Sequence, residues 1–287
     1  MLNVIILTDG CNTQGCALAL GGFDGVHVGH RRLIARAKLQ GVPVGVMTIV
    51  GAKGDVLFTL EERLQVFRTV GADFVVAFDF ADIRDQSAED FLRMLEEKFS
   101  PAQYVCGYDF RFGKDALGDA DTILRVSDVP VSKENLVSID GEKVSTRNLK
   151  KLLAAGDVDS LRLLLGAPFF VTGKVESGRK VGRTMGFPTA NIVYPQGKTK
   201  PKAGVYQTRV RIDGQLYKGI TNFGPSPTFG EQTVCLETHL DGFCGDLYGK
   251  TLTVQFIRFL RDIEQFPSAD ALKEQLEKDL RKVREND

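Results

Sequence analysis

The chain has 287 residues, with 37 Lys and Arg against 37 Asp and Glu, 43% hydrophobic residues and 26% charged residues. This length suits two domains of ordinary size and is enough to bury a substantial core. The composition is that of a globular protein, which excludes a chain that is disordered throughout. The balanced charge argues against a general binder of nucleic acid or of anionic membranes. We therefore expect neither partner, although a local basic pocket for phosphates remains compatible with this balance.

The five cysteines follow neither a disulfide framework nor a zinc spacing. Cys235, His239 and Cys244 are closest to a metal pattern, but their intervals match no common zinc site. Reduced thiols and a cytoplasmic location are therefore expected. No apolar run approaches the length of a bilayer span, and the apolar start at residues 1–7 favours a short strand over a signal peptide.

In the first half of the chain, short β runs alternate with helical patterns. Thr59 and Ser87 are typical helix N-caps, each followed by acidic residues in the first turn. The alternation predicts an open parallel sheet with helices on both faces, whose ligands bind at the carboxyl ends of the strands. Strands are expected at residues 1–7, 17–20, 42–50, 74–78 and 104–106, and helices at 28–39, 60–70, 88–99 and 145–155.

The second half has a different pattern of short β runs separated by turns. Asp213-Gly214 is a hairpin signature, and Ser268 caps an amphipathic helix expected at residues 269–284. The pattern predicts a compact antiparallel sheet or barrel followed by this helix. We place the two domains at residues 1–157 and 158–287. The strands are expected at residues 169–175, 204–212, 215–223, 234–240 and 252–260.

Two of the three histidines lie in one tetrapeptide, His27-Val28-Gly29-His30, at an expected helix start. Histidines three residues apart share a helix face, and the free N–H groups of a helix start attract anions. Gly25 and Gly29 let the backbone approach a ligand closely. Two imidazoles in this position can bind phosphate oxygens and stabilise the charge that develops on a transferred phosphorus. The pattern therefore indicates a catalytic phosphate site rather than a turn with two surface histidines.

The run at residues 22–30 resembles the signature of the HxGH nucleotidyltransferases. More closely, it resembles the FAD synthetase half of the bacterial bifunctional riboflavin kinase/FMN adenylyltransferases, which residues 107–113 and 144–146 also fit. The resemblance implies that the phosphate of FMN attacks the α-phosphorus of ATP, with His27 and His30 as catalytic residues. It also implies nucleotide contacts by Gly21, Phe23, Asp24, Gly25, Gly29, Ser145 and Thr146, and flavin contacts by Asp109, Phe110, Phe112 and Lys150.

Residues 178–191 form a glycine-rich loop that leads through Pro188 into an extended segment. Thr189 and Asn191 are two residues apart on this segment, so they face the same side and offer oxygen ligands for Mg²⁺. The loop resembles the Mg–ATP element in the riboflavin kinase half of the same family, and residues 222–229 and 236–240 also match. The resemblance implies nucleotide contacts by Gly178, Gly182, Arg183 and Gly186, metal contacts by Thr189 and Asn191, a flavin contact by Asn222, and Glu237 as the base for the ribityl hydroxyl.

Two features depart from the family pattern. Residues 48–53 lack the usual Phe-x-Pro element, and Lys150 stands where the family has an arginine, which alone can bind phosphate in a bidentate way. We predict an α/β Rossmann-like nucleotidyltransferase domain, followed by a small antiparallel β-barrel riboflavin kinase domain with a C-terminal helix. The expected enzyme makes FMN from riboflavin and FAD from FMN with Mg–ATP. The alternatives are a riboflavin kinase with a weak or silent adenylyltransferase domain, and a non-catalytic flavin- or nucleotide-binding regulator.

Overall fold

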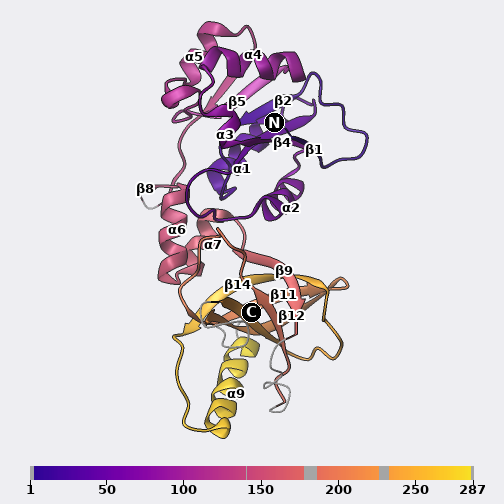
Figure 1. Cartoon of the computed structure of the whole chain (residues 1–287), viewed down its shortest axis with the longest axis vertical. Helices are drawn as coiled ribbons and strands as arrows, with labels where there is room; N and C mark the ends of the chain where they lie inside the picture. The colour runs from indigo at the N-terminus through magenta and orange to yellow at the C-terminus, as the bar shows by residue number, and fades with distance from the viewer. Residues whose placement is uncertain (1–2, 140, 178–185, 226–232, 286–287) are drawn as a thin grey trace. The chain divides into compact units, whose positions relative to one another are not determined.

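The computed structural model describes residues 3–139, 141–177, 186–225 and 233–285 (Figure 1). Gly178, Gly182 and Arg183, three of the expected nucleotide contacts, lie outside these ranges. Contacts along the chain divide it into two compact units, Met1–Asn148 and Leu149–Asp287. The domain boundary expected between residues 157 and 158 stays a prediction.

The first unit is built on a six-stranded sheet with the strand order β1-β4-β3-β2-β5-β6. β1 pairs with β4 in the antiparallel sense, and the other pairs are parallel, which confirms the expected sheet. From β2 the chain continues to β3, which pairs with one edge of β2, and later returns to β5, which pairs with the other edge. Ligands of such sheets bind at this switch point, between the carboxyl ends of β2 and β5. The strands are β1 (Asn3–Ile6), β2 (Ala17–Leu20), β3 (Val44–Val50), β4 (Phe74–Asp79), β5 (Gln103–Gly107) and β6 (Val131–Glu134).

Alternating side chains of the strands determine which helix covers each face of this sheet. Leu18 and Leu20 of β2 belong to a buried cluster that they share with α4 and α5. Ala17 and Ala19 therefore face the opposite side, where α1 contacts β2, β3 and β5. The elements around the sheet are α1 (Val28–Lys38), α2 (Leu60–Val70), α3 (Phe80–Ile83), α4 (Ala88–Phe99), η1 (Lys114–Ala116), α5 (Ala120–Val126), and the hairpin of β7 (Ser138–Ile139) and β8 (Glu142–Lys143).

Side-chain caps fix the starts of the helices as the sequence predicts. The Thr59 hydroxyl accepts a hydrogen bond from the Glu62 N–H at 3.3 Å, and the Glu62 carboxylate accepts one from the Thr59 N–H at 2.9 Å. This capping box begins α2. The Ser87 hydroxyl accepts a hydrogen bond from the Asp90 N–H at 3.0 Å and begins α4. Both predicted helix starts are confirmed.

The second unit is a closed antiparallel barrel with the strand order β10-β13-β12-β11-β14-β9, and β9 pairs with β10 to close it. Asp213 and Gly214 both have a positive φ, as a two-residue hairpin between β11 and β12 requires. Buried threonine hydroxyls form a row across three neighbouring strands of the barrel. The Thr221 Oγ1 lies 2.8 Å from the Thr208 Oγ1 and 2.9 Å from the Thr238 Oγ1. The expected barrel is confirmed. Its strands are β9 (Phe170–Glu176), β10 (Thr189–Val193), β11 (Gly204–Ile212), β12 (Gln215–Pro225), β13 (Val234–Leu240) and β14 (Thr251–Arg261).

The expected C-terminal helix, α9 (Ala269–Glu285), packs on this barrel. Leu280 and Val283 of α9 share a buried cluster with Phe187 and Ile220. Arg261 donates through Nε to the fully buried Asp279 carboxylate at 2.9 Å, which joins α9 to β14. Two further helices, α6 (Thr146–Ala155) and α7 (Val158–Leu165), complete the described elements. In the part of the chain that the structure describes, no helix has both the length and the apolar surface needed to cross a bilayer.

Candidate active sites

A cavity of about 310 Å³ lies at the switch point of the first unit. Its lining comes mainly from the segments after β2, β5 and β6, from β3, and from the turn before α6. This is the edge where the strand order predicts a ligand. Of the expected site residues, the cavity is lined by Gly21, His27, Gly29, His30, Asp109, Phe110, Ser145 and Thr146.

The two histidines of this cavity are fixed by the start of α1. His27 is the N-cap residue, and its Nδ1 accepts a hydrogen bond from the His30 N–H at 3.3 Å. The two imidazole rings stack with their centroids 3.7 Å apart. Because Nδ1 of neutral His27 accepts, its proton is on Nε2. Nε2–H of His27 is therefore a donor that the helix cap leaves available for an oxygen of a ligand.

Burial keeps both imidazoles neutral. It lowers the pKa of His27 to about 4, against the smaller opposing effect of the Asp109 charge. It also lowers the pKa of His30 well below its usual value, with a further contribution from His27. At neutral pH the pair therefore supplies N–H dipoles rather than positive charge. Any cation that balances a bound phosphate must come from another side chain.

Three of the expected nucleotide contacts do not line the cavity: Phe23, Asp24 and Gly25. The Phe23 ring centroid lies 4.6 Å from that of His30. A Cβ at Gly21 would lie 2.8 Å from the Phe23 ring, so this close approach requires a glycine. The Asp24 carboxylate accepts a hydrogen bond from the Leu57 N–H at 2.7 Å. In this structure these residues support the turn between β2 and α1 that lines the cavity, and their nucleotide contacts stay a prediction.

A buried arginine that the sequence analysis missed also supports this turn. Arg63 of α2 donates through Nη1 to the Thr48 hydroxyl and to the Ile49 carbonyl, both at 2.8 Å. The Thr48 hydroxyl in turn donates to the Gly22 carbonyl at 2.9 Å. Arg63 thus joins the end of β3 to the glycine turn that lines the cavity. The available signal was a charged residue on the apolar face of an amphipathic helix.

The segment after β5 forms the other wall of the cavity. The Asp109 carboxylate accepts a hydrogen bond from the Lys143 ammonium group. The rings of Phe110 and Phe112 stack with centroids 5.3 Å apart, but Phe112 is buried in the core and only Phe110 lines the cavity. Lys150 belongs to the second unit. The flavin contacts expected of Phe112 and Lys150 stay predictions.

The turn before α6 contributes two of the expected nucleotide contacts. The Ser145 hydroxyl accepts a hydrogen bond from the Asn148 N–H at 3.4 Å and so caps the start of α6. Ser145 and Thr146 both line the cavity. A helix start at the wall of the cavity presents free N–H groups to an anion.

In the second unit, strand register brings the expected kinase residues together. Asn191 of β10 and Asn222 of β12 are each directly opposite Glu237 of β13, one on either side. Thr189 is directly opposite His239 in the same β10–β13 pair. Directly opposite residues have Cβ atoms about 4.5–5.5 Å apart and point to the same face of the sheet. The pairing thus places a carboxylate between two carboxamides, beside a threonine hydroxyl.

A cavity of about 630 Å³ adjoins this row, and Thr189 and Asn191 line it. Glu237 and Asn222 do not line it and are half-buried. Gly186, at φ +82°, makes the turn that leads to Phe187 and Pro188, a conformation that favours glycine. A ring nitrogen of His239, Nδ1, lies 3.0 Å from the Pro188 carbonyl oxygen and holds this turn.

The depressed pKa of His27 predicts a loss of stability in acid. In the unfolded chain the imidazole takes up its proton near 6.5, whereas in the folded chain it does so near 4. Between these pH values the unfolded state binds more protons than the folded state. The contribution of His27 to the free energy of unfolding is therefore fully present above pH 6.5 and is lost as the pH falls toward 4. We expect the protection of α1 amides from hydrogen exchange to decrease over this window. His27→Asn should flatten the decrease, and an equal slope in parent and variant would contradict the prediction.

Comparison with known proteins supplies the family. A family model described as FAD synthetase matches residues 10–148, and one described as riboflavin kinase matches residues 165–286. The chain is 36% identical to a bifunctional riboflavin kinase/FMN adenylyltransferase of Pseudomonas fluorescens, over 94% of this chain and 93% of that protein. The chain belongs to this bifunctional family. The resemblance, fold class and enzyme class expected from the motifs are thereby confirmed, and two catalytic domains of flavin cofactor biosynthesis are favoured over the alternatives.

Other members of the family are similar to this chain along most of their length. Proteins of the same description from Haemophilus influenzae and Bacillus subtilis are each 31% identical, over 93% and 91% of this chain and 92% and 89% of theirs. A Streptococcus pneumoniae crystal structure, described as a macrolide-efflux protein, has a TM-score of 0.87 and 27% identity over 98% of both chains. The two-part fold is thus shared over nearly the whole chain.

Proposed function

We propose that the second unit of this chain phosphorylates riboflavin to FMN with Mg–ATP. The first unit then transfers AMP from a second ATP to FMN, which gives FAD and pyrophosphate. The observation that carries the proposal is the pairing of Glu237 with Asn191 on one side and Asn222 on the other, because it puts a proton acceptor beside oxygen ligands. We place the enzyme in the cytoplasm, in keeping with cysteines that are all free thiols.

In the kinase step, the terminal ribityl hydroxyl of riboflavin attacks the γ-phosphorus of ATP. The O–H bond breaks as the new P–O bond forms, and Glu237 accepts the proton. The bond between the γ-phosphorus and the bridging oxygen breaks, and ADP leaves. Asn222 is directly opposite Glu237, on the side away from Asn191, and we assign it to orient riboflavin beside this base. Positioning provides most of the rate enhancement in such transfers.

The oxygen chemistry of β10 fits a hard divalent cation. The Thr189 hydroxyl and the Asn191 carboxamide both border the larger cavity, and Nδ2 of Asn191 donates to the Thr189 carbonyl at 3.5 Å. This bond leaves the Asn191 Oδ1 for a ligand. Mg²⁺ held with ATP would neutralise charge on the phosphates. Thr189 and Asn191 are the residues that we propose to hold it.

In the adenylyl transfer, a phosphate oxygen of FMN attacks the α-phosphorus of ATP. A P–O bond forms to FMN, the bond from the α-phosphorus to its bridging oxygen breaks, and pyrophosphate leaves. His27 is placed to donate from Nε2–H to an oxygen on the phosphorus under attack, because its Nδ1 is held by the backbone. Neutral imidazole donors in a buried site stabilise the developing charge without reorganisation.

A time course tests both activities in one tube. The purified chain is incubated with riboflavin and Mg–ATP, and riboflavin, FMN and FAD are separated at intervals. FMN should appear first and FAD should follow. FMN that accumulates without FAD would support the alternative of a kinase with a silent adenylyltransferase domain. A reaction in which neither product forms would leave the non-catalytic regulator as the better interpretation.

Thr189→Val tests the metal assignment. The change removes an oxygen ligand at almost constant volume, so the Mg²⁺ concentration for half-maximal FMN formation should increase several-fold. FAD formation from supplied FMN should keep its Mg²⁺ dependence, because Thr189 belongs to the other compact unit. Thr189→Ser, which keeps the hydroxyl, is the matched control. A Mg²⁺ titration identical to that of the parent would overturn this assignment.

A further inference from the structure

The cavity of the first unit needs positive charge, because its substrates there are polyanions under the proposed function. Its two histidines are neutral. Among the described residues that line it, the cationic side chains are Arg111 and Lys143. Lys143 is hydrogen-bonded to the Asp109 carboxylate. The other acidic lining residue, Glu134, forms an ion pair with Arg32 at 3.2 Å, outside the lining. Arg111 is therefore the cation whose contacts decide what the cavity can bind.

Within the described part of the chain, the contacts of Arg111 engage Nη1 alone, which leaves most of its donors for a ligand. Its Nη1 donates to the Phe110 carbonyl at 3.0 Å and lies 3.8 Å from the Asp119 carboxylate, beyond hydrogen-bond distance. A guanidinium group has five N–H donors in a planar fork that matches phosphate. The side chain is 52% exposed, so this fork is open to an anion.

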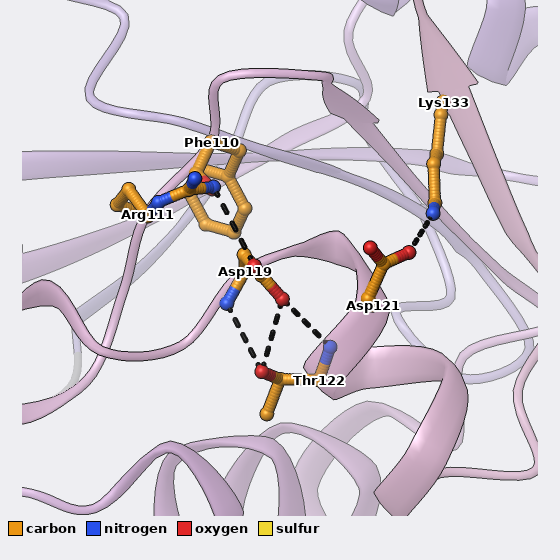
Figure 2. A network of polar contacts seen from close by, with 6 residues as sticks. All are labelled: Phe110, Arg111, Asp119, Asp121, Thr122 and Lys133. Carbon is orange, nitrogen blue, oxygen red and sulfur yellow. Dashed lines mark hydrogen bonds and ion pairs between the residues drawn. The ribbon is translucent and has the colours of Figure 1, made fainter.

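The carboxylate that orients Arg111 is itself firmly fixed. Figure 2 shows Asp119 between Arg111 and Thr122. Asp119 Oδ1 accepts hydrogen bonds from the Thr122 N–H at 2.8 Å and from the Thr122 hydroxyl at 3.0 Å. These bonds to Thr122, with a smaller effect of Arg111, lower the pKa of Asp119 and keep it charged. An ion pair of Lys133 with Asp121 also joins β6 to the same turn of α5 (Figure 2). A fixed anchor of this kind reduces the cost of ordering a long side chain on binding.

We propose that Arg111 binds the phosphate group of FMN and so selects the phosphorylated flavin for adenylylation. Arg111 follows β5, on the wall formed with Asp109 and Phe110, whereas His27 and His30 follow β2 on the opposite side of the switch point. The phosphate of the flavin therefore meets the guanidinium fork while the nucleotide occupies the histidine side. This inference rests on the proposed adenylyltransferase function and names the residue that recognises one of its two substrates.

Steady-state kinetics of FAD formation from supplied FMN and ATP tests the proposal. Arg111→Gln should raise the KM for FMN more than tenfold, as expected for the loss of charge-assisted hydrogen bonds, and should leave the KM for ATP within about twofold. Arg111→Lys keeps the charge without the fork and should fall between the parent and the glutamine variant. Riboflavin phosphorylation by the same preparations should be unchanged, which shows that the second unit is folded, and the unchanged KM for ATP shows the same for the first unit, which holds Arg111.

Arg84→Gln is the matched control, because Arg84 is also exposed and paired with a carboxylate, Asp85, but does not line the cavity. It should leave both KM values unchanged. A KM for FMN in Arg111→Gln within twofold of the parent would overturn the proposal. An increase confined to the KM for ATP would assign Arg111 to the triphosphate instead and would equally overturn it. A parent that forms no FAD would overturn the proposed function itself, and the role of Arg111 with it.

Discussion

Glu237→Gln is expected to slow FMN formation by about 10²–10⁴, the usual cost of removing a general base. Glutamine keeps the shape of the side chain between Asn191 and Asn222 but cannot accept the proton of the ribityl hydroxyl. Binding of ATP and the thermal stability of the chain should remain close to those of the parent. The rate of FMN formation under saturating riboflavin and Mg–ATP measures the effect.

The barrel offers a matched control for this prediction. Glu176 of β9 lies directly opposite Asn191 on the side away from Glu237, and its side chain is exposed. Glu176→Gln makes the same chemical change beside the same asparagine, and we expect a much smaller effect on FMN formation. A large loss in Glu176→Gln with little loss in Glu237→Gln would mean that the base has been assigned to the wrong carboxylate. FMN formation by Glu237→Gln within about threefold of the parent would also contradict the role, because the expected loss is far larger.

His30→Ala is expected to reduce FAD formation by at least about 10²–10³, comparable to the loss of one preorganised donor at a developing negative charge. The structure leaves the Nδ1 of His30 buried and without a hydrogen-bond partner among the described residues. A buried nitrogen without a partner in the fold lowers stability, and a ligand in the cavity that His30 lines could supply that partner. FAD formation from supplied FMN and ATP measures the loss.

The two active sites provide each other's controls. His30→Ala should leave FMN formation at the parent rate, and Glu237→Gln should leave FAD formation from supplied FMN at the parent rate. Because His30 packs on Phe23, a second variant, His30→Asn, preserves more of this contact and should lose FAD formation to a similar degree. The assignment of His30 would be wrong if either variant, shown to be folded, made FAD within about threefold of the parent rate.

The structure shows how the segment that lacks the Phe-x-Pro element is held. The segment that lacks the Phe-x-Pro element begins at the end of β3 and returns to α2 through Leu57 and Phe58, whose N–H groups both donate to Asp24. Both of these side chains are buried. The end of this loop is therefore fixed to the glycine turn by Asp24, whereas residues 51–55 are exposed. Whether the loop still serves the flavin is decided by the ratio of FAD formation to FMN formation in the time course.

The sequence alone determined the elements whose local signals are strong. The capping box of Thr59 and Glu62 and the cap at Ser87 fixed two helix starts, because the orphan N–H groups of a helix can be satisfied by the nearest side chains. The Asp213-Gly214 hairpin was predicted for a similar reason, since both residues tolerate the positive φ that the turn requires. The family followed from motifs that combine rare residues, such as two of three histidines in four positions.

Tertiary structure alone decided which distant residues meet. The elements α5, α7 and β6 are not predicted from the sequence, because each is eight residues or fewer and a pattern of one or two turns, or of one short strand, is too brief to stand out. The register that places Glu237 between Asn191 and Asn222 depends on pairing between strands far apart in sequence, which no local pattern specifies. Likewise, the sequence contains Arg111 and Asp119 only as two charges eight residues apart. The fold makes them a pair at the cavity, because the segment after β5 turns back onto the start of α5.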